Sequence, residues 1–121
     1  MNELKQETPK KCALYARCNR PRTRSVELQV ANCRAEAQKR GWIVAEHHVF
    51  TDAGWYSRMA MSDRPGLGAL LAAARSEPRP FDCVIVDGTS RLSHWVSDVL
   101  SVFSTLSRLG IAILPLPDGS D

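Results

Sequence analysis

Residues 11–18 read Lys-Cys-Ala-Leu-Tyr-Ala-Arg-Cys, and this stretch decides the fold. Its apolar residues follow one another with little alternation, which is typical of a strand covered on both faces by helices. The stretch ends in polar residues, since Arg17 stands near its end and Asn19 follows it. We therefore expect a buried strand of a parallel sheet, with polar side chains at its carboxyl end.

The rest of the chain alternates between helix and strand. The first helix is predicted from Ser25, whose hydroxyl can cap it, to Arg40, and Gly41 ends it. A strand is predicted over 42–50 and ends at Thr51-Asp52. The second helix has Asp63 as its cap and Pro65 in its first turn, and it ends before Pro78. The remaining elements are predicted as a strand over 81–87, a helix over 95–109 closed by Gly110, and a strand over 111–116.

Apolar spacing predicts which side of each helix packs on the sheet. The expected buried positions are Val26, Val30, Cys33 and Ala37 in the first helix, Leu67, Leu70, Leu71 and Ala74 in the second, and Val96, Val99, Leu100, Phe103 and Leu106 in the third. Trp42 and Trp95 are expected to lie in the core as well.

The order β-α-β-α-β-α-β with apolar strands predicts an α/β fold. We expect a four-stranded, mostly parallel sheet with helices on both faces, which makes a three-layer sandwich. The chain has 121 residues, enough for one domain. That domain is expected to span residues 12–116, after a flexible lead-in over 1–11 and before a tail over 117–121.

Composition excludes several classes of protein. No apolar run approaches the roughly 18 residues of a membrane span, and residues 1–11 lack the apolar centre of a secretory signal. Four cysteines without a C-x-x-C pair predict reduced thiols in a cytoplasmic protein. The formal net charge of +3 permits contact with nucleic acid.

The sequence predicts neither a cofactor nor a metal. It contains no G-x-x-x-x-G-K-[ST] motif and no G-x-G-x-x-G after the first strand, so nucleotide cofactors have little support. His47 and His48 are neighbours on a predicted strand and should face opposite sides, which argues against joint metal ligation.

Polar residues follow each of the first three strands. They are Arg17, Asn19, Arg20, Arg22 and Arg24 after the first, Asp52 and Arg64 after the second, and Asp87, Ser90, Arg91 and His94 after the third. In a parallel sheet these groups share one edge, where ligands bind at the switch point of the strand order. Converging guanidinium groups favour a phosphate-bearing ligand, because their planar donors match phosphate oxygens. Taken singly, such arginines are more commonly solvated or paired with Asp at the surface.

The order and spacing of these blocks resemble the catalytic domain of serine recombinases, the resolvase and invertase family, from Cys12 to Leu116. In that family the first strand ends in Tyr-x-Arg-Val-Ser, and the Ser attacks DNA. Arg17 matches the Arg of this pattern, and Asn19 stands at the position of the Ser.

The later blocks of the family also have counterparts. Gln29 matches the Gln that closes Ser-[Ile/Leu]-x-x-Gln, and Asp52 matches the Asp after the second strand. Arg64 matches the Arg of Asp-Arg-x-Gly-Leu. In the third block Arg91 is kept, while His94 replaces a second Arg.

The resemblance implies a domain of DNA strand exchange with Arg17, Gln29, Asp52, Arg64 and Arg91 in its site. The phosphate contacts it implies fall to Arg17, Arg20, Arg22, Arg24, Arg64 and Arg91. Because Asn19 has no hydroxyl and His94 is mostly neutral near pH 7, the domain is predicted to be catalytically degenerate. The family's long dimerisation helix and DNA-binding domain are not expected before Asp121, so DNA binding should be weak and directed at phosphates.

Two other hypotheses remain. The chain is alternatively a non-catalytic interaction module, which forms a homodimer or pairs with an intact recombinase and regulates it. The last alternative is a stable fold without a role. None of these hypotheses involves a membrane.

Overall fold

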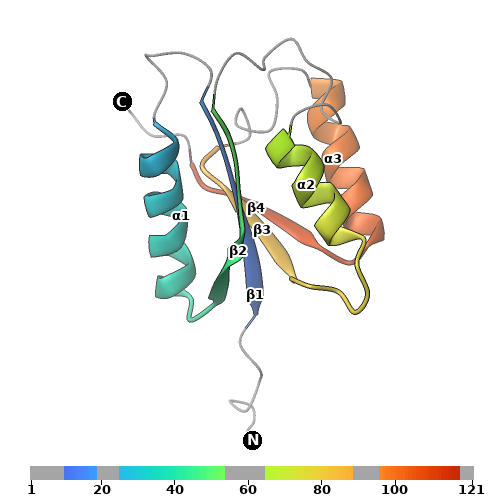
Figure 1. Ribbon diagram of the computed structural model, residues 1–121, viewed down its shortest axis with the longest axis horizontal. Helices are drawn as coiled ribbons and strands as arrows, with labels where there is room; N and C mark the ends of the chain where they lie inside the picture. The colour runs from blue at the N-terminus through green and yellow to red at the C-terminus, as the bar shows by residue number, and fades with distance from the viewer. Residues whose placement is uncertain (1–9, 19–24, 54–64, 89–95, 118–121) are drawn as a thin grey trace, which may run out of the picture.

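A computed structural model describes residues 10–18, 25–53, 65–88 and 96–117 of the chain (Figure 1). The strands are β1 (Lys11–Cys18), β2 (Ile43–Ala53), β3 (Cys83–Val86) and β4 (Ala112–Pro115), and the helices are α1 (Val26–Lys39), α2 (Pro65–Ala74) and α3 (Val96–Arg108). Each predicted element is present, with bounds that differ from the prediction by a few residues.

The four strands form one sheet in the order β2-β1-β3-β4, and every neighbouring pair is parallel. Helix α1 covers one face of the sheet, and α2 and α3 both lie on the other (Figure 1). The predicted α/β sandwich is therefore confirmed. Because the chain returns from β2 across β1 to reach β3, the strand order reverses between β1 and β3, which makes this the switch point of the fold.

Side chains of the two inner strands alternate between two cores. On the face of α2 and α3, Ala13 and Tyr15 of β1 pack with Val84 and Val86 of β3. On the face of α1, Cys12, Leu14, Cys83 and Ile85 pack with Cys33 and Ala37. Both strands are buried on both faces, as their lack of alternation predicts.

Local signals set the bounds of α1. Ser25 has an extended backbone and accepts a hydrogen bond at its Oγ from the Leu28 N–H over 3.1 Å, which is the predicted N-cap. After the helix, Gly41 adopts a left-handed backbone with φ of 74°, which favours glycine and stops the helix. The next strand then begins within two residues.

Helix packing differs from the prediction in two places. In α1 the fully buried residue of the first turns is Gln29, while Val26 and Val30 are half-buried, and Val30 packs against the core with Cys33 and Ala37. In α3 Val102 is buried with Leu106, whereas Leu100 is 59% exposed. The spacing of apolar residues predicts which side of a helix faces the sheet. How the helix lies across the sheet then decides which residues on that side are fully buried.

The expectation that His47 and His48 point to opposite sides of β2 is also wrong. The pairing of β1 with β2 moves from Cys12 opposite Val44 to Leu14 opposite Val49, so β2 contains extra residues at this point. Such a bulge breaks the alternation of the strand. The two imidazole rings lie 4.1 Å apart between centroids, and His48 packs edge-on against Phe81. Burial, followed by the charges of His47 and Lys11, lowers the pKa of His48.

The cysteine prediction holds for the residues that the structure covers. Cys12, Cys33 and Cys83 are free and buried. Burial raises the pKa of both Cys12 and Cys33 to about 12, which favours the protonated thiol over the thiolate. None of the three helices in the described ranges has the length and hydropathy to cross a bilayer.

Candidate phosphate-binding edge of the sheet

The carboxyl ends of the parallel strands form one edge of the sheet, which we call the carboxyl edge. Arg17 ends the buried part of β1 and lies opposite Asp52 of β2, while Asp87 follows β3. All three side chains are at most 3% exposed. The structure therefore brings Arg17, Asp52 and Asp87 to the switch point as predicted, and buries them there.

Asp52 holds three donors from two other elements. Its Oδ1 accepts the Gly66 N–H over 2.6 Å, and its Oδ2 accepts the Leu67 N–H over 3.0 Å. The Oδ2 atom also accepts the Tyr15 hydroxyl over 2.7 Å. The first N–H groups of a helix lack partners within the helix, and a carboxylate satisfies them while matching the positive end of the dipole. Asp52 thus fixes the start of α2 against β1 and β2, and its role is positioning.

Gln29 holds the end of β1. Its side-chain oxygen accepts the Arg17 N–H over 3.0 Å, and its side-chain nitrogen donates to the Arg17 carbonyl over 2.7 Å. The carboxamide thus pairs with both main-chain groups of one residue, as a neighbouring strand would. Since Gln29 is fully buried on α1, this pair fixes the backbone from which the Arg17 side chain extends.

Gly66 allows α2 to approach the end of β2 closely. A Cβ atom added at this position would collide with the Thr51 carbonyl oxygen and would lie 2.9 Å from the Asp52 Oδ1. The backbone of Gly66 is not in a left-handed conformation, so the requirement for glycine is one of space. This close approach lets the Asp52 carboxylate reach both N–H groups.

Arg17 brings a buried guanidinium to this edge. A cation held away from water keeps a strong field, because the surrounding medium screens it less than bulk solvent does. Arg17 comes from the same side of β1 as Ala13 and Tyr15, by the alternation of the strand, and so belongs to the face of α2. A planar guanidinium donor suits a phosphate oxygen better than a metal ion or an apolar ligand. Among the described residues, no group of His, Cys, Asp and Glu is arranged to hold a metal.

Several predicted site residues lie outside the described ranges. They are Asn19, Arg20, Arg22, Arg24, Arg64, Arg91 and His94, together with the cap predicted at Asp63. Their roles therefore stay predictions. Of the residues predicted at this edge, the structure describes Arg17, Gln29, Asp52 and Asp87.

The prediction from sequence missed two residues that build this edge, Tyr15 and Gly66. Tyr15 carried a usable signal, because a phenol in a fully buried strand needs a partner for its hydroxyl. Gly66 gave a weaker signal, since a glycine in the first turn of a helix is unfavourable and calls for a steric reason.

The fold and this edge define a class of protein: a doubly wound parallel α/β domain whose carboxyl edge carries buried charged residues beside the β1–β3 switch point. Residues 12–121 match the family described as the resolvase N-terminal domain. The chain belongs to this family, which comprises the catalytic domains of serine recombinases.

Solved structures agree with this assignment. The N-terminal catalytic domain of TP901-1 integrase is 28% identical, with a TM-score of 0.77 over 88% of this chain and 77% of that one. The C-terminal catalytic domain of ISC1926 TnpA, an IS607-like serine recombinase, is 22% identical, with a TM-score of 0.73 over 91% and 72% of the two chains. A resolvase family site-specific recombinase from Streptococcus pneumoniae is 22% identical, with a TM-score of 0.70 over 92% and 74%. The latter two show a shared fold. A search of curated proteins gives no match.

Proposed function

We propose that this domain binds the DNA backbone at its carboxyl edge and does not cleave DNA. The observation that carries the binding is the buried Arg17, whose main chain is fixed by Gln29 beside the switch point. Family membership supports DNA as the source of the phosphate. Arg20, Arg22, Arg24, Arg64 and Arg91 are proposed to extend the contact.

Asn19 carries the second half of the proposal. Serine recombinases form a phosphoserine link to DNA, and the resemblance places Asn19 where that Ser stands. A carboxamide has no proton that a general base can remove to give a nucleophile near neutral pH, so no covalent link can form at this position. At the position of His94 the family carries an Arg, and the change also removes a fixed cation from the site.

The binding half is tested with duplex DNA at low salt. Replacing Arg17 or Arg91 by Ala should lower the affinity by about tenfold, because each substitution removes a charged phosphate contact. Arg34→Ala is the matched control, since Arg34 lies on α1 and forms an ion pair with Glu46 of β2 over 2.7 Å. Circular dichroism checks that each variant is folded. Unchanged affinity in both Arg17→Ala and Arg91→Ala would contradict the proposal.

The catalytic half is tested by searching for a DNA–protein adduct on a denaturing gel. The protein should give no adduct, whereas Asn19→Ser supplies the hydroxyl that the proposal says is missing. An adduct in the unaltered protein would show that another residue attacks DNA. An adduct in Asn19→Ser alone would show that the remaining site is competent.

A second candidate function is a non-catalytic module that pairs with itself or with an intact recombinase. The observation that favours it is Leu100, an apolar side chain on α3 that is 59% exposed. Sedimentation should then show a dimer, or a complex with a recombinase, that Leu100→Ser disrupts. A protein that stays monomeric and forms no complex with a recombinase would exclude this candidate.

In either function we place the protein in the cytoplasm, which agrees with its three described free thiols.

A further inference from the structure

The amino ends of the strands form the opposite edge of the sheet, the amino edge, and this edge carries a row of cations. A basic residue precedes or begins each strand in the order in which the strands lie in the sheet. These residues are Arg40 before β2, Lys10 and Lys11 at β1, Arg79 before β3 and Arg108 before β4. Because neighbouring strands lie about 4.8 Å apart, the row extends along roughly 14 Å of the edge.

The helices end at the same edge and extend the row (Figure 1). Lys39 closes α1, and Arg75 follows α2, where its guanidinium donates to the Leu71 carbonyl over 3.2 Å. All seven cations of the amino edge are exposed. Three described carboxylates lie with them, Glu36, Glu77 and Asp82, which leaves an excess of four positive charges at this edge. That excess is larger than the net charge of the whole chain, +3.

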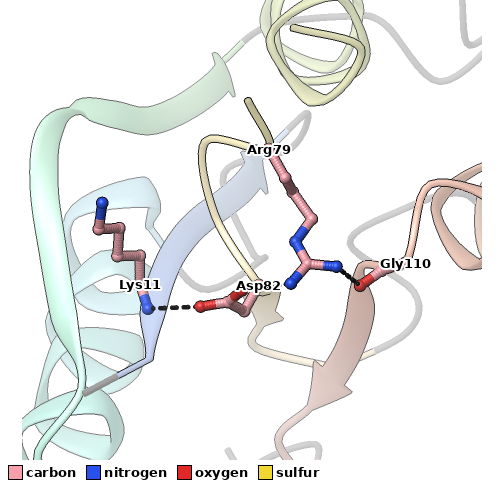
Figure 2. A network of polar contacts seen from close by, with 4 residues as sticks. All are labelled: Lys11, Arg79, Asp82 and Gly110. Atoms are coloured by element: carbon pink, nitrogen blue, oxygen red, sulfur yellow. Dashed lines mark hydrogen bonds and ion pairs between the residues drawn. The ribbon is translucent and has the colours of Figure 1, made fainter. Parts of the chain in front are cut away.

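Two of the three carboxylates are already in use by the fold. Glu36 accepts from Arg40 over 2.5 Å. Asp82 accepts from Arg79 over 2.9 Å and from the Lys11 N–H over 3.1 Å, as Figure 2 shows. By contrast, Lys10, Lys39 and Arg108 form no ion pair within the described ranges. Their charges are therefore available to a partner.

The pKa of the Cys83 thiol reflects two of these cations. Burial is the largest influence on the Cys83 thiol and raises its pKa, whereas the charges of Lys10 and Arg40 act in the opposite direction. These two cations, which are distant in the sequence, therefore lie close to the start of β3. Positive charge accumulates along the edge in the folded protein.

We propose that the amino edge is a second DNA-backbone surface, which binds a duplex segment other than the one at the carboxyl edge. A row of exposed cations at near-regular spacing fits a polyanion that carries closely spaced phosphates. A protein partner fits less well, since interface centres are rich in aromatic residues and poor in Lys. Among the described large apolar residues that are exposed, only Ile43 lies at this edge, which also leaves no anchor for a membrane.

The two edges cannot share one local contact. β1 runs between them with eight residues, which span about 26 Å. A phosphate group held at Arg17 is therefore remote from the cations at Lys10 and Lys11. The surface proposed here is independent of the catalytic machinery of the family, and its variants leave Arg17, Gln29 and Asp52 unchanged.

The test measures the affinity of the full chain for a duplex as a function of salt. The variant Lys10→Gln, Lys39→Gln, Arg108→Gln removes the three cations without ion pairs. Each phosphate contact contributes about 0.9 to the slope of log K against log salt, so the slope should become shallower by about 2 to 3. The matched control is Ala31→Glu, Ala69→Glu, Ser104→Glu, which lowers the net charge by the same amount at exposed positions on the three helices.

The control should retain most of the slope of the unaltered protein. Equal slopes in the amino-edge variant and in the control would overturn the proposal, because the effect would then come from net charge alone. If the amino-edge variant keeps the salt slope of the unaltered protein and only Arg17→Ala makes the slope shallower, DNA binds at the carboxyl edge alone. That result would also overturn the proposal. If Arg17→Ala and Arg91→Ala bind normally while the amino-edge variant does not, the proposed function fails and this proposal stands. If the unaltered chain binds an acidic protein but not DNA, the proposal of a DNA surface is wrong and the amino edge is a protein-binding surface.

Discussion

The two edges of the sheet use polar residues in different ways. At the carboxyl edge Arg17, Gln29 and Asp52 are buried, and their partners belong to other elements of the fold. At the amino edge Arg79 and Asp82 are partly exposed, and they connect the starts of β1 and β3 with the turn before β4 (Figure 2). The first arrangement is shielded from solvent, and the second is open to water and salt.

This difference shows which edge of the sheet holds its side chains in one precise arrangement. A buried polar group without a partner costs its full desolvation energy, so the carboxyl edge tolerates one arrangement of its elements. Exposed ion pairs contribute little, since water replaces the lost partner. A site that must hold a phosphate in register belongs at the first edge, whereas a surface that attracts a polyanion without register belongs at the second.

The largest expected effect is that of Asp52→Ala. This change removes the carboxylate that accepts from the Tyr15 hydroxyl and from the N–H groups of Gly66 and Leu67. We expect a loss of about 4 kcal/mol in the free energy of unfolding, measured by urea titration, because each hydrogen bond to a charged group contributes about 1.5 to 3 kcal/mol and the three are not additive.

Tyr15→Phe is the matched control for Asp52→Ala. It removes one of the three donors and keeps the buried ring, so it should cost about 1.5 to 2 kcal/mol. Equal losses in the two variants would show that the helix start at Gly66 does not depend on the carboxylate.

The fold was predictable because its signals are local. The Ser25 cap, the stop at Gly41 and the apolar strands each act within a few residues, and they set the elements and their order. The parallel sheet then follows from that order, because chains of this pattern connect neighbouring strands through helices.

The candidate site was predictable only in part, because its contacts are long-range. Strand-end placement indicates Asp52, but its hydroxyl partner at Tyr15 is 37 residues away. The burial of Gln29 follows from a pairing with the main chain of Arg17, which apolar spacing on a helix cannot reveal. The bulge at His47 and His48 depends in the same way on the register between β1 and β2.

A smaller loss is expected from Gly66→Ala, which tests the close approach of α2 to β2. The added methyl group collides with the Thr51 carbonyl oxygen, so the helix start must shift. We expect about 2 to 3 kcal/mol of destabilisation by urea titration, in the range of overpacked cores.

Gly41→Ala separates this steric effect from backbone strain. Its Cβ atom would meet nothing within 4 Å, but its φ is 74°. Strain alone should cost about 1 to 2 kcal/mol there.

The Gly66→Ala variant should also weaken the Asp52 contacts, so Asp52→Ala should cost less stability when it is introduced into that variant. Full additivity of the two changes would refute a shared origin.

Gln29→Met should cost about 2 kcal/mol. The methionine keeps the length and burial of the side chain but cannot pair with the N–H and carbonyl groups of Arg17. Hydrogen exchange should accelerate at the Arg17 amide, which is a local readout of the lost pair. Gln38→Met is the control on the exposed side of the same helix and should change stability by less than about 0.5 kcal/mol. A protected Arg17 amide in Gln29→Met would contradict this account.

The smallest effect is expected at the amino edge, from Asp82→Asn. The Lys11 N–H, followed by the nearby Arg79, lowers the pKa of Asp82 below its ordinary value of 3.8. The unfolded chain therefore binds this proton more tightly than the folded chain does. The contribution of the carboxylate to stability is present above about pH 4 and is lost as the pH falls through the folded pKa.

At pH 7 the loss in Asp82→Asn should be about 1 kcal/mol or less, since the ion pair with Arg79 is partly exposed. The difference between this variant and the unaltered protein should shrink toward zero on acidification below pH 4, and it should shrink at pH 7 when salt is added. Unfolding followed by circular dichroism at each pH measures both trends. A difference that neither acid nor salt reduces would mean that the amino edge is held as rigidly as the carboxyl edge, and the contrast between the two would fail.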